Sequence, residues 1–301
     1  MKRISGKGQL TVLNFHKISD HPFDRHEAVP PLVFDEIVGW LKQNFDIVSF
    51  RDLPHLRPGG RPRLIVTFDD GYLEFIDVAA PIARRHAIPV NINIVPGCVD
   101  DGTPPFNVIV KDFIFQAPAL LLRETPLPGL PHGADPDRRD VSALIASAAL
   151  KNRPIAQQRA EWKTLWPKIS RFDGLKTTPM MTRSHILQLI DEFECGAHSF
   201  EHATMSAETD DYLRDDFERC RKWWRDVIGR ECEIYSFPNG GATARQTDLA
   251  LQHGFSQALL VGENYSAIDA RIHPRLTMSG RHFREALVRA LGGPRYWKHG
   301  V

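Results

Sequence analysis

Two adjacent carboxylates, Asp69 and Asp70, directly follow an apolar run in the segment "RLIVTFDDGY". Each makes the other harder to ionise, so a neighbouring group has to stabilise the charged pair. A cation could do so, or the carboxylates could cap the free N–H groups of a following helix. Both can hold together, because a helix dipole helps to keep a metal-binding carboxylate ionised. One carboxylate would then bind the cation, and the other would remain nearby as a base with a tuned pKa.

Two histidines, His198 and His202, lie four residues apart in "GAHSFEHATM", close enough to converge on one cation if the segment turns helically. On their own, two histidines on a solvated turn would be the simpler interpretation. The acidic pair changes this, because one Asp and two His at strand ends form a three-ligand set that leaves positions open for water on a catalytic metal. We therefore predict a divalent metal ion as cofactor, with zinc first and cobalt, nickel or iron as alternatives.

Two further segments carry weaker signals. In "YSFPNGG", Pro238, Asn239 and Gly240 would let the backbone approach a ligand and point N–H groups at it, although an ordinary turn has the same composition. In "LTVLNFHKI", His16 ends an apolar, strand-like run. A single histidine after a strand is more often structural than catalytic, so neither segment identifies a site by itself.

The elements that must position these residues alternate between helix and strand. Apolar residues at helical spacing in 34–41 are followed by a strand-like segment at 46–50. The run at 63–68 is β-prone throughout, as in a parallel strand that is buried on both faces. Helix and strand then follow each other up to residue 95, which indicates an α/β fold.

This alternation is interrupted once. Four prolines lie within 125–136, and two helical patterns follow at 140–150 and 155–166. Because strands and helices resume afterwards, we expect residues 101–177 to form an insertion or lid within a single catalytic domain that spans 1–301.

Composition narrows the class of ligand. The chain has 301 residues, of which 42% are hydrophobic, enough for a full-sized core. Its formal net charge of +1 gives no electrostatic reason to expect nucleic acid or an anionic membrane, and no apolar run approaches the length of a membrane span. A small or neutral ligand is therefore favoured, and the oligomeric state is left open.

Cysteine usage and the amino terminus suggest a location. The four cysteines show no CxxC pairing, which fits reduced thiols in a reducing compartment. The basic amino-terminal segment has only a short apolar stretch, broken by Asn14 and His16, and no small-residue cleavage site, so it does not look like a signal peptide. We expect a cytoplasmic protein.

Taken together, the segments resemble the polysaccharide deacetylase family (carbohydrate esterase family 4). "TFDDGY" is similar to its first motif, "HSFEH" to its second and "SFPNGG" to a variant of its third, and the resemblance spans residues 10–290 apart from the insertion. It implies an irregular (β/α) barrel with the site at the carboxyl ends of the strands. It also implies that Asp69 is the general base, and that Asp70, His198 and His202 are the metal ligands. Ser199 would hold the histidine-bearing loop in shape.

The chain departs from the usual family pattern in its general acid. No late Leu-x-His motif follows "PRLTM". The chain is instead similar to the circularly permuted branch that includes the poly-N-acetylglucosamine deacetylases, which begins with a strand bearing the corresponding histidine. "VLNFH" matches that pattern, so the resemblance assigns the acid to His16, with His273 in "RIHPRL" as the rival.

A second departure concerns an arginine. The family's third motif usually begins with an arginine that orients the catalytic Asp, whereas Tyr235 or Ser236 occupies that position here. Arg275, at the start of the "PRLTM" strand, could supply the guanidinium from a neighbouring strand. An ordinary surface arginine at a strand entrance is the alternative.

The resemblance implies removal of an N-acetyl group from an amino sugar in an oligosaccharide, a polysaccharide or a biosynthetic precursor. Metal-bound water would attack the acetyl carbonyl while Asp69 takes the proton, a backbone N–H near Asn239 would help to stabilise the oxyanion, and His16 would protonate the departing amine. A non-catalytic sugar-binding relative that keeps the metal pocket is the alternative. A His16 within reach of the metal pocket would favour the enzyme. A serine esterase and a zincin protease are poor rivals, because G-x-S-x-G and H-E-x-x-H are absent from the sequence.

Overall fold

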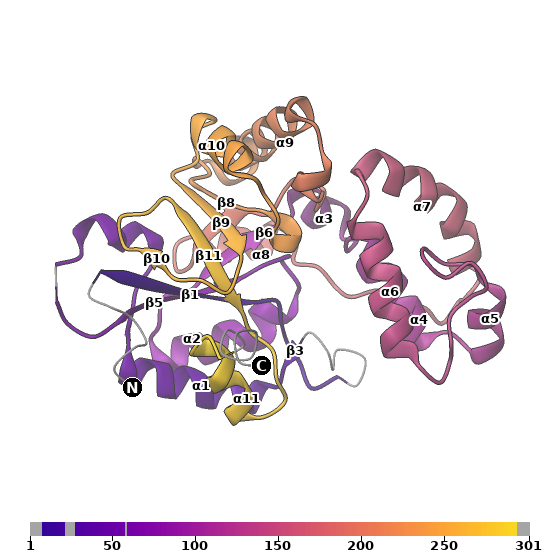
Figure 1. The fold of residues 1–301 in the computed structure, drawn as a ribbon, viewed down its shortest axis with the longest axis horizontal. Coiled ribbons are helices and arrows are strands. Elements are labelled where there is room, and N and C mark those ends of the chain that lie inside the picture. Colours follow the sequence, from indigo (N-terminus) through magenta and orange to yellow (C-terminus); the bar gives the residue numbers. More distant parts are fainter. Residues whose placement is uncertain (1–7, 22–27, 58, 294–301) are drawn as a thin grey trace, which may run out of the picture.

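Seven parallel strands close into a barrel (Figure 1). The structure is a computed structural model that describes residues 8–21, 28–57 and 59–293. Strand β1 pairs in parallel with both β11 and β5, and this double pairing closes the ring. The predicted irregular (β/α) barrel is confirmed. The barrel strands, in spatial order, are β1 (Gln9–Phe15), β11 (Ile272–Thr277), β9 (Gln257–Val261), β8 (Ile234–Ser236), β7 (Glu194–Ala197), β6 (Asn91–Ile94) and β5 (Arg63–Phe68).

Short strands at the barrel's edge make it irregular. Strand β4 (Asp46–Ile47) pairs in parallel with the beginning of β5, and β10 (Ser266–Ala267) pairs antiparallel with the beginning of β1. A separate two-strand sheet is formed by β2 (Lys17–Ile18) and β3 (Ala28–Val29). The predicted strand at 46–50 is therefore mostly wrong, because the Ser49 and Asp52 side chains form a capping box that starts a 3₁₀ turn at Phe50.

The helices and helical turns lie outside the barrel or in its connections. The helices are α1 (Pro31–Asn44), α2 (Ala80–His86), α3 (Pro96–Asp101), α4 (Phe106–Gln116), α5 (Ala119–Glu124), α6 (Arg139–Lys151), α7 (Ile155–Ile169), α8 (Arg183–Leu189), α9 (Asp210–Trp223), α10 (Ala244–Gln252) and α11 (Phe283–Ala290). The shorter turns are η2 (Phe50–His55), η3 (Phe75–Ala79), η4 (Met205–Ala207), η5 (Trp224–Ile228) and η6 (Pro238–Gly240). Within the described residues, no helix is long and apolar enough to cross a membrane.

Strand alternation divides the barrel into an outer and an inner set of side chains. On β5, Leu64, Val66 and Phe68 pack into the cluster that contains the covering helices. Ile65 belongs instead to a second cluster with Leu10, Val12, Ile234 and Leu259 from other barrel strands. Because alternate residues of a strand share a face, Thr67 and Asp69 follow Ile65 along the inner face toward the carboxyl ends. The fold therefore delivers Asp69 to the mouth of the barrel.

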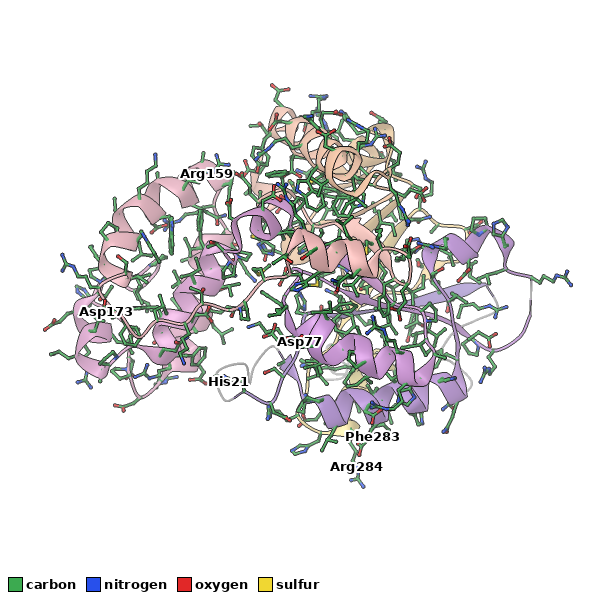
Figure 2. The ribbon with its side chains drawn as sticks, turned by 180° about the vertical axis from the view of Figure 1, so that it is seen from behind. His21, Asp77, Arg159, Asp173, Phe283 and Arg284 are labelled. Atoms are coloured by element: carbon green, nitrogen blue, oxygen red, sulfur yellow. The ribbon has the colours of Figure 1, made fainter. Side chains whose placement is uncertain are left out.

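Helices α4 to α7 form a group beside the barrel, between β6 and β7 in the chain. Both views show the group on one side of the barrel (Figures 1 and 2), and Figure 2 shows Asp173 near its outer end. These helices have an apolar cluster of their own, which includes Val110, Phe113, Leu150 and Leu165. The group thus has a core separate from that of the barrel.

Candidate active site

The candidate site lies at the carboxyl ends of β5 and β7, where the backbone takes unusual turns. Asp70, directly beyond Asp69 at the end of β5, has a φ of 75°, and Ser199 and His202 beyond β7 have φ of 58° and 59°. Such positive φ values are uncommon for residues other than glycine and often occur at functional sites. The turn at Asp70 separates the two neighbouring carboxylates, so that each meets different partners.

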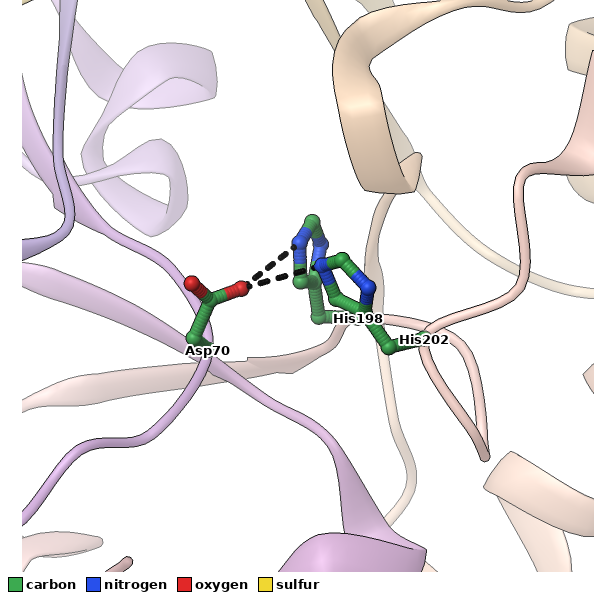
Figure 3. Close-up of side chains that lie close together, drawn as sticks. All are labelled: Asp70, His198 and His202. Carbon is green, nitrogen blue, oxygen red and sulfur yellow. Dashed lines mark ion pairs between the residues drawn. The ribbon is translucent and has the colours of Figure 1, made fainter. Parts of the chain in front are cut away.

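Asp70 faces the two histidines. Its Oδ1 lies 3.3 Å from Nε2 of His198 and 3.3 Å from Nε2 of His202 (Figure 3). All three side chains are buried, and the three ligand atoms lie within 4.8 Å of one another. The two carboxylates do not cap the following helix, because the helical turn that begins at Phe75 has no side-chain cap.

The hydrogen bonding of His198 fits a metal ligand. Its Nδ1 lies 2.9 Å from the carbonyl oxygen of Ser236, and a carbonyl can only accept, so Nδ1 carries the hydrogen. In the neutral form of the ring, Nε2 then presents its lone pair toward Asp70. Asp70 Oδ1 is buried and accepts no hydrogen bond from the residues that the structure describes. Lone pairs that converge in this way are stabilised by a shared cation, so the residues present fit a divalent metal ion.

Asp69 faces a buried arginine instead. Arg275 donates from Nη1 to Oδ1 of Asp69 at 2.9 Å and from Nη2 to Oδ2 at 2.6 Å. Asn93 donates to Oδ1 at 2.9 Å, and the Ser236 hydroxyl lies 3.2 Å from the same oxygen. Burial acts to raise the pKa of Asp69, but the charges of Arg275 and then His198 outweigh it, so the pKa lies below its ordinary value. Asp69 is therefore ionised at neutral pH.

Arg275 is fully buried, so the alternative of a surface arginine does not apply. Besides Asp69, its guanidinium donates to Asn14 Oδ1 at 3.1 Å, Thr67 Oγ1 at 3.2 Å and Ser236 Oγ at 2.8 Å. These partners come from three other barrel strands, which places the guanidinium in a polar layer across the barrel interior. The guanidinium reaches Asp69 from β11, and the Ser236 hydroxyl of β8 contacts both groups.

The two candidate general acids lie in different places. His16, just beyond β1, lines the same pocket as Asp69 and Asp70. His273 precedes Arg275 by two residues and therefore lies deeper along the inner face of β11. It is fully buried, contacts Ser266 Oγ at 2.7 Å and Gln257 Oε1 at 2.9 Å, and is absent from the described pocket lining. Burial lowers its pKa to about 4, so it is a neutral core histidine.

The segment after β8 packs tightly under the pocket. Pro238 is buried, and Asn239 lines the pocket with a φ of 56°. The Asn239 amide donates to Thr204 Oγ1 at 2.7 Å. Gly240 has a φ of 73°, and a Cβ there would lie 2.1 Å from Cβ of Val261. Only glycine fits this position, so the backbone beside it is held close to the pocket.

The loop at 198–203, which carries the two histidines, is held by hydrogen bonds to a buried acid that the sequence analysis missed. The Ser199 hydroxyl donates to Asp216 Oδ1 at 2.9 Å and accepts the N–H of Ala203 at 3.1 Å. Asp216 also accepts the Phe200 N–H at 2.8 Å and the Tyr235 hydroxyl at 2.7 Å. Burial raises the pKa of Asp216 to about 6, against the effect of these hydrogen bonds. The sequence did contain one indication of this role, because Asp216 lies within the apolar stripe of α9.

We expect Asp216→Ala to weaken metal binding about 10- to 100-fold and to destabilise the fold by about 2–4 kcal/mol, because it leaves buried donors without an acceptor. Zinc titration and urea unfolding would measure the two effects. The neighbouring Asp215 is exposed, and Asp215→Ala is the matched control, with near-unchanged values. Equal behaviour of the two variants would contradict a positioning role for Asp216.

These side chains surround one pocket with a volume of about 390 Å³, within the range of about 300–1,000 Å³ typical of small-molecule sites. The helical group, which lies within the insertion or lid expected at 101–177, contributes to its wall. The lining residues from that group are Asn107 and Lys111 of α4 and Lys151 of α6. The other lining residues, besides those already named, are Tyr72, Phe237, Val261, Thr277, Met278 and Ser279.

Comparison with known proteins gives one sequence match and several structural ones. The family described as polysaccharide deacetylase matches residues 181–258. No curated protein sequence matches the chain significantly. The segment matched contains His198, Ser199 and His202 and extends through β8 into β9.

Three solved structures illustrate the shared fold. The Streptococcus pyogenes deacetylase PplD in complex with acetate is 12% identical, with a TM-score of 0.62, and the alignment covers 95% of this chain and 99% of that one. IcaB from Ammonifex degensii is 14% identical, with a TM-score of 0.61 and coverage of 95% and 98%. A de-N-acetylase from Aggregatibacter actinomycetemcomitans is 15% identical, with a TM-score of 0.55 and coverage of 90% and 95%. This protein is thus similar to polysaccharide deacetylases in sequence over residues 181–258, and it shares the barrel fold of these three structures over nearly its whole length.

Proposed function

We propose that this protein is a metal-dependent hydrolase that removes N-acetyl groups from an amino sugar in an oligosaccharide, a polysaccharide or a biosynthetic precursor. The observation that carries the proposal is that a possible metal-binding set and a charged Asp–Arg pair lie side by side at one pocket. Asp70 faces His198 and His202 at 3.3 Å, and Asp69 beside them is paired with buried Arg275. One set fits a cation and the other fits a base.

Asp70, His198 and His202 would hold the metal, with zinc as our first choice and cobalt, nickel or iron as alternatives. A divalent ion there would supply Lewis acidity, polarising a carbonyl and acidifying water. The neutral tautomer of His198, fixed by the Ser236 carbonyl, supports this role. The PplD structure was determined with acetate, the product expected from the reaction proposed for this chain.

Asp69 would accept a proton from the attacking water. A base with a depressed pKa stays ionised, and the bidentate bond to Arg275 fixes the direction of its carboxylate. We propose Arg275 as the substitute for the arginine that the third motif usually carries. It acts through Asp69 rather than on the substrate.

His16 would donate a proton to the departing amine, since an amine leaves an amide only when protonated. Its place in the pocket wall supports this choice over His273, whose ring contacts Ser266 and Gln257. The backbone beside Pro238, Asn239 and Gly240 would contribute an N–H to the oxyanion. The presence of His16 in the pocket also favours an enzyme over a sugar-binding relative.

We propose that helices α4 to α7 act as the wall of the substrate site, as the expected insertion at 101–177. Asn107, Lys111 and Lys151 in the pocket lining support this role. The partner proposed is an N-acetylated sugar rather than nucleic acid. All four cysteines are buried and free, which supports the proposal of a reducing, cytoplasmic location.

The proposal is tested by measuring acetate release from short N-acetylglucosamine oligomers. Metal-stripped protein should release none, and zinc or cobalt should restore release. We expect His16→Ala to lower the rate about 10²- to 10⁴-fold, whereas His273→Ala, judged at equal folded fraction, leaves the rate near wild type. Release that survives His16→Ala but not His273→Ala would overturn the assignment of the acid. Equal release with and without metal would overturn the metal-dependent mechanism.

A further inference from the structure

A second pocket lies beside the loop at 198–203. Its volume is about 200 Å³, and its lining includes Phe106 and Glu201. The next residue along the chain in each case, Asn107 and His202, lines the pocket of the proposed site. Because consecutive residues lie about 3.8 Å apart, the two pockets adjoin along the start of α4 and this loop.

The second pocket has the size and the chemistry of a site for one sugar unit. Its volume lies below the range of about 300–1,000 Å³ typical of sites that enclose a whole ligand, so it suits one part of a ligand that extends from the proposed site. Phe106 supplies an apolar ring, and Arg159 of α7 forms an ion pair with Glu201 in the wall. A guanidinium donates to sugar hydroxyls and a carboxylate accepts from them, so neither group requires a charged sugar.

A row of aromatic rings continues from the second pocket along α7. Phe106 stacks on Trp162 with ring centroids 5.0 Å apart, and Trp162 lies 5.2 Å from Trp166. Ile155 and Arg159 line the pocket, and the two tryptophans follow at helical spacing on the same face of α7. Figure 2 shows Arg159 where the helical group meets the barrel. The helix carries the row about 10 Å outward from Arg159 to Trp166.

The outer end of this aromatic row is exposed. Trp166 has 41% of its surface accessible, and among the residues that the structure describes it is the only exposed Phe, Tyr or Trp. An exposed indole lacks the stabilisation that burial of its ring would give. The faces of aromatic rings are negatively polarised and attract C–H groups, such as those on the faces of a pyranose ring. A chain of sugar units that leaves the second pocket along α7 would therefore cover the row.

We propose that the second pocket and the aromatic row bind further sugar units of a chain whose N-acetylated unit occupies the proposed site. The inference rests on the proposed function for that unit, and on the adjoining pocket and the exposed rings for the others. Helices α4 and α7 thus take part directly in substrate binding, and they make the affinity depend on chain length.

The first test measures binding without turnover. Metal-stripped full-length protein is titrated by calorimetry with N-acetylglucosamine oligomers of two and of five units. We expect the wild type to bind the five-unit oligomer about 10-fold or more tightly than the two-unit oligomer, because only the longer chain reaches the row. Equal affinity of the wild type for the two oligomers would overturn the inference.

Variants assign this preference to the second pocket and the row. Trp166→Ala should lower it about 2- to 10-fold, and Trp166→Phe, which keeps a ring, should retain most of it. Arg159→Met removes the donors in the second pocket and should lower the preference as well. Leu120→Ala on α5 removes a side chain that is 68% exposed in the same helical group, and it should match the wild type.

Thermal melts of these variants exclude misfolding as the cause of a lost preference. A preference that persists in both Trp166→Ala and Arg159→Met would overturn the inference. The elution volume on size exclusion tests another occupant of the row. A dimer that Trp166→Ala dissociates, with oligomer binding as in the wild type, would assign the exposed indole to a contact between two copies of the chain and overturn the sugar site.

Acetate release separates this inference from the proposed function. With zinc-loaded protein, Trp166→Ala should raise the KM for the five-unit oligomer several-fold, with a smaller effect on the two-unit oligomer and on kcat. Equal release from both oligomers, by wild type and Trp166→Ala alike, would uphold the deacetylase and overturn the extended sugar site. Binding of the five-unit oligomer that depends on Trp166, with no acetate from either oligomer, would uphold the extended site and overturn the deacetylase.

Discussion

Asp69→Asn is expected to lower the rate of acetate release about 10²- to 10⁴-fold while zinc binding persists. The amide keeps nearly the same shape and can still accept a hydrogen bond from Arg275, but it cannot take a proton. The proposed metal ligands are untouched, because Asp70 faces His198 and His202 and Asp69 faces the arginine. The variant therefore separates the base from the metal site.

Acetate release and zinc stoichiometry measured on the same preparation would test this separation. Because the substitution leaves Arg275 without a counter-charge, the folded fraction has to be measured as well. Asp248→Asn, an exposed acid on α10, is the control and should match the wild type. Wild-type rates in Asp69→Asn would contradict the role of Asp69, and loss of zinc would contradict the division of labour between the two carboxylates.

Arg275→Met is expected to have the largest effect on stability, about 3–5 kcal/mol near neutral pH, because it leaves a buried carboxylate without its partner. In the wild type the pKa of Asp69 is lowered, so its contribution to stability is present above the unfolded value of about 3.9 and is lost as the pH falls through the folded value. Without the arginine, burial raises this pKa. The variant should then lose stability as the pH rises through the raised pKa.

Urea unfolding at pH 5 and pH 8 measures this change of sign. Arg275→Met should be relatively more stable at pH 5, and the acid limb of its activity should move to higher pH. The double variant with Asp69→Asn should recover much of the stability and none of the activity, whereas Arg284→Met, on the outer surface in Figure 2, is a neutral control. A stability loss of equal size in the single and double variants would contradict the pairing of Arg275 with Asp69.

The fold could be predicted where local patterns determine it. The β-prone run at 63–68 became β5, and the alternation of helix and strand indicated an α/β fold, whereas the barrel was implied by the family resemblance. Boundaries were less accurate: the helical pattern predicted at 155–166 extends to Ile169, and the strand predicted at 46–50 covers only Asp46–Ile47. Barrel closure joins β1 to β5 and β11, contacts that no local pattern specifies.

In the candidate site too, residues in short sequence motifs could be predicted, whereas residues placed by tertiary packing could not. Asp70, His198 and His202 were found together because short motifs carry them, and the structure brings them within 3.3 Å contacts. Asp216 was missed because the sequence alone does not explain an acid within an apolar helix stripe. Only the structure shows the buried groups that donate hydrogen bonds to it. Lys111 was missed because the tertiary packing of the helical group alone places it in the pocket. The catalytic roles themselves stay predictions.

The most direct test of the central claim is a stepwise titration of zinc into metal-stripped protein, with acetate release from N-acetylglucosamine oligomers measured at each step. If Asp70, His198 and His202 form one catalytic metal site, activity rises linearly and reaches a plateau at one zinc per chain, and His202→Gln shifts the rise to much higher zinc concentration. Activity that is already complete before zinc is added, or that shows no break near one equivalent in the wild type, would contradict the account.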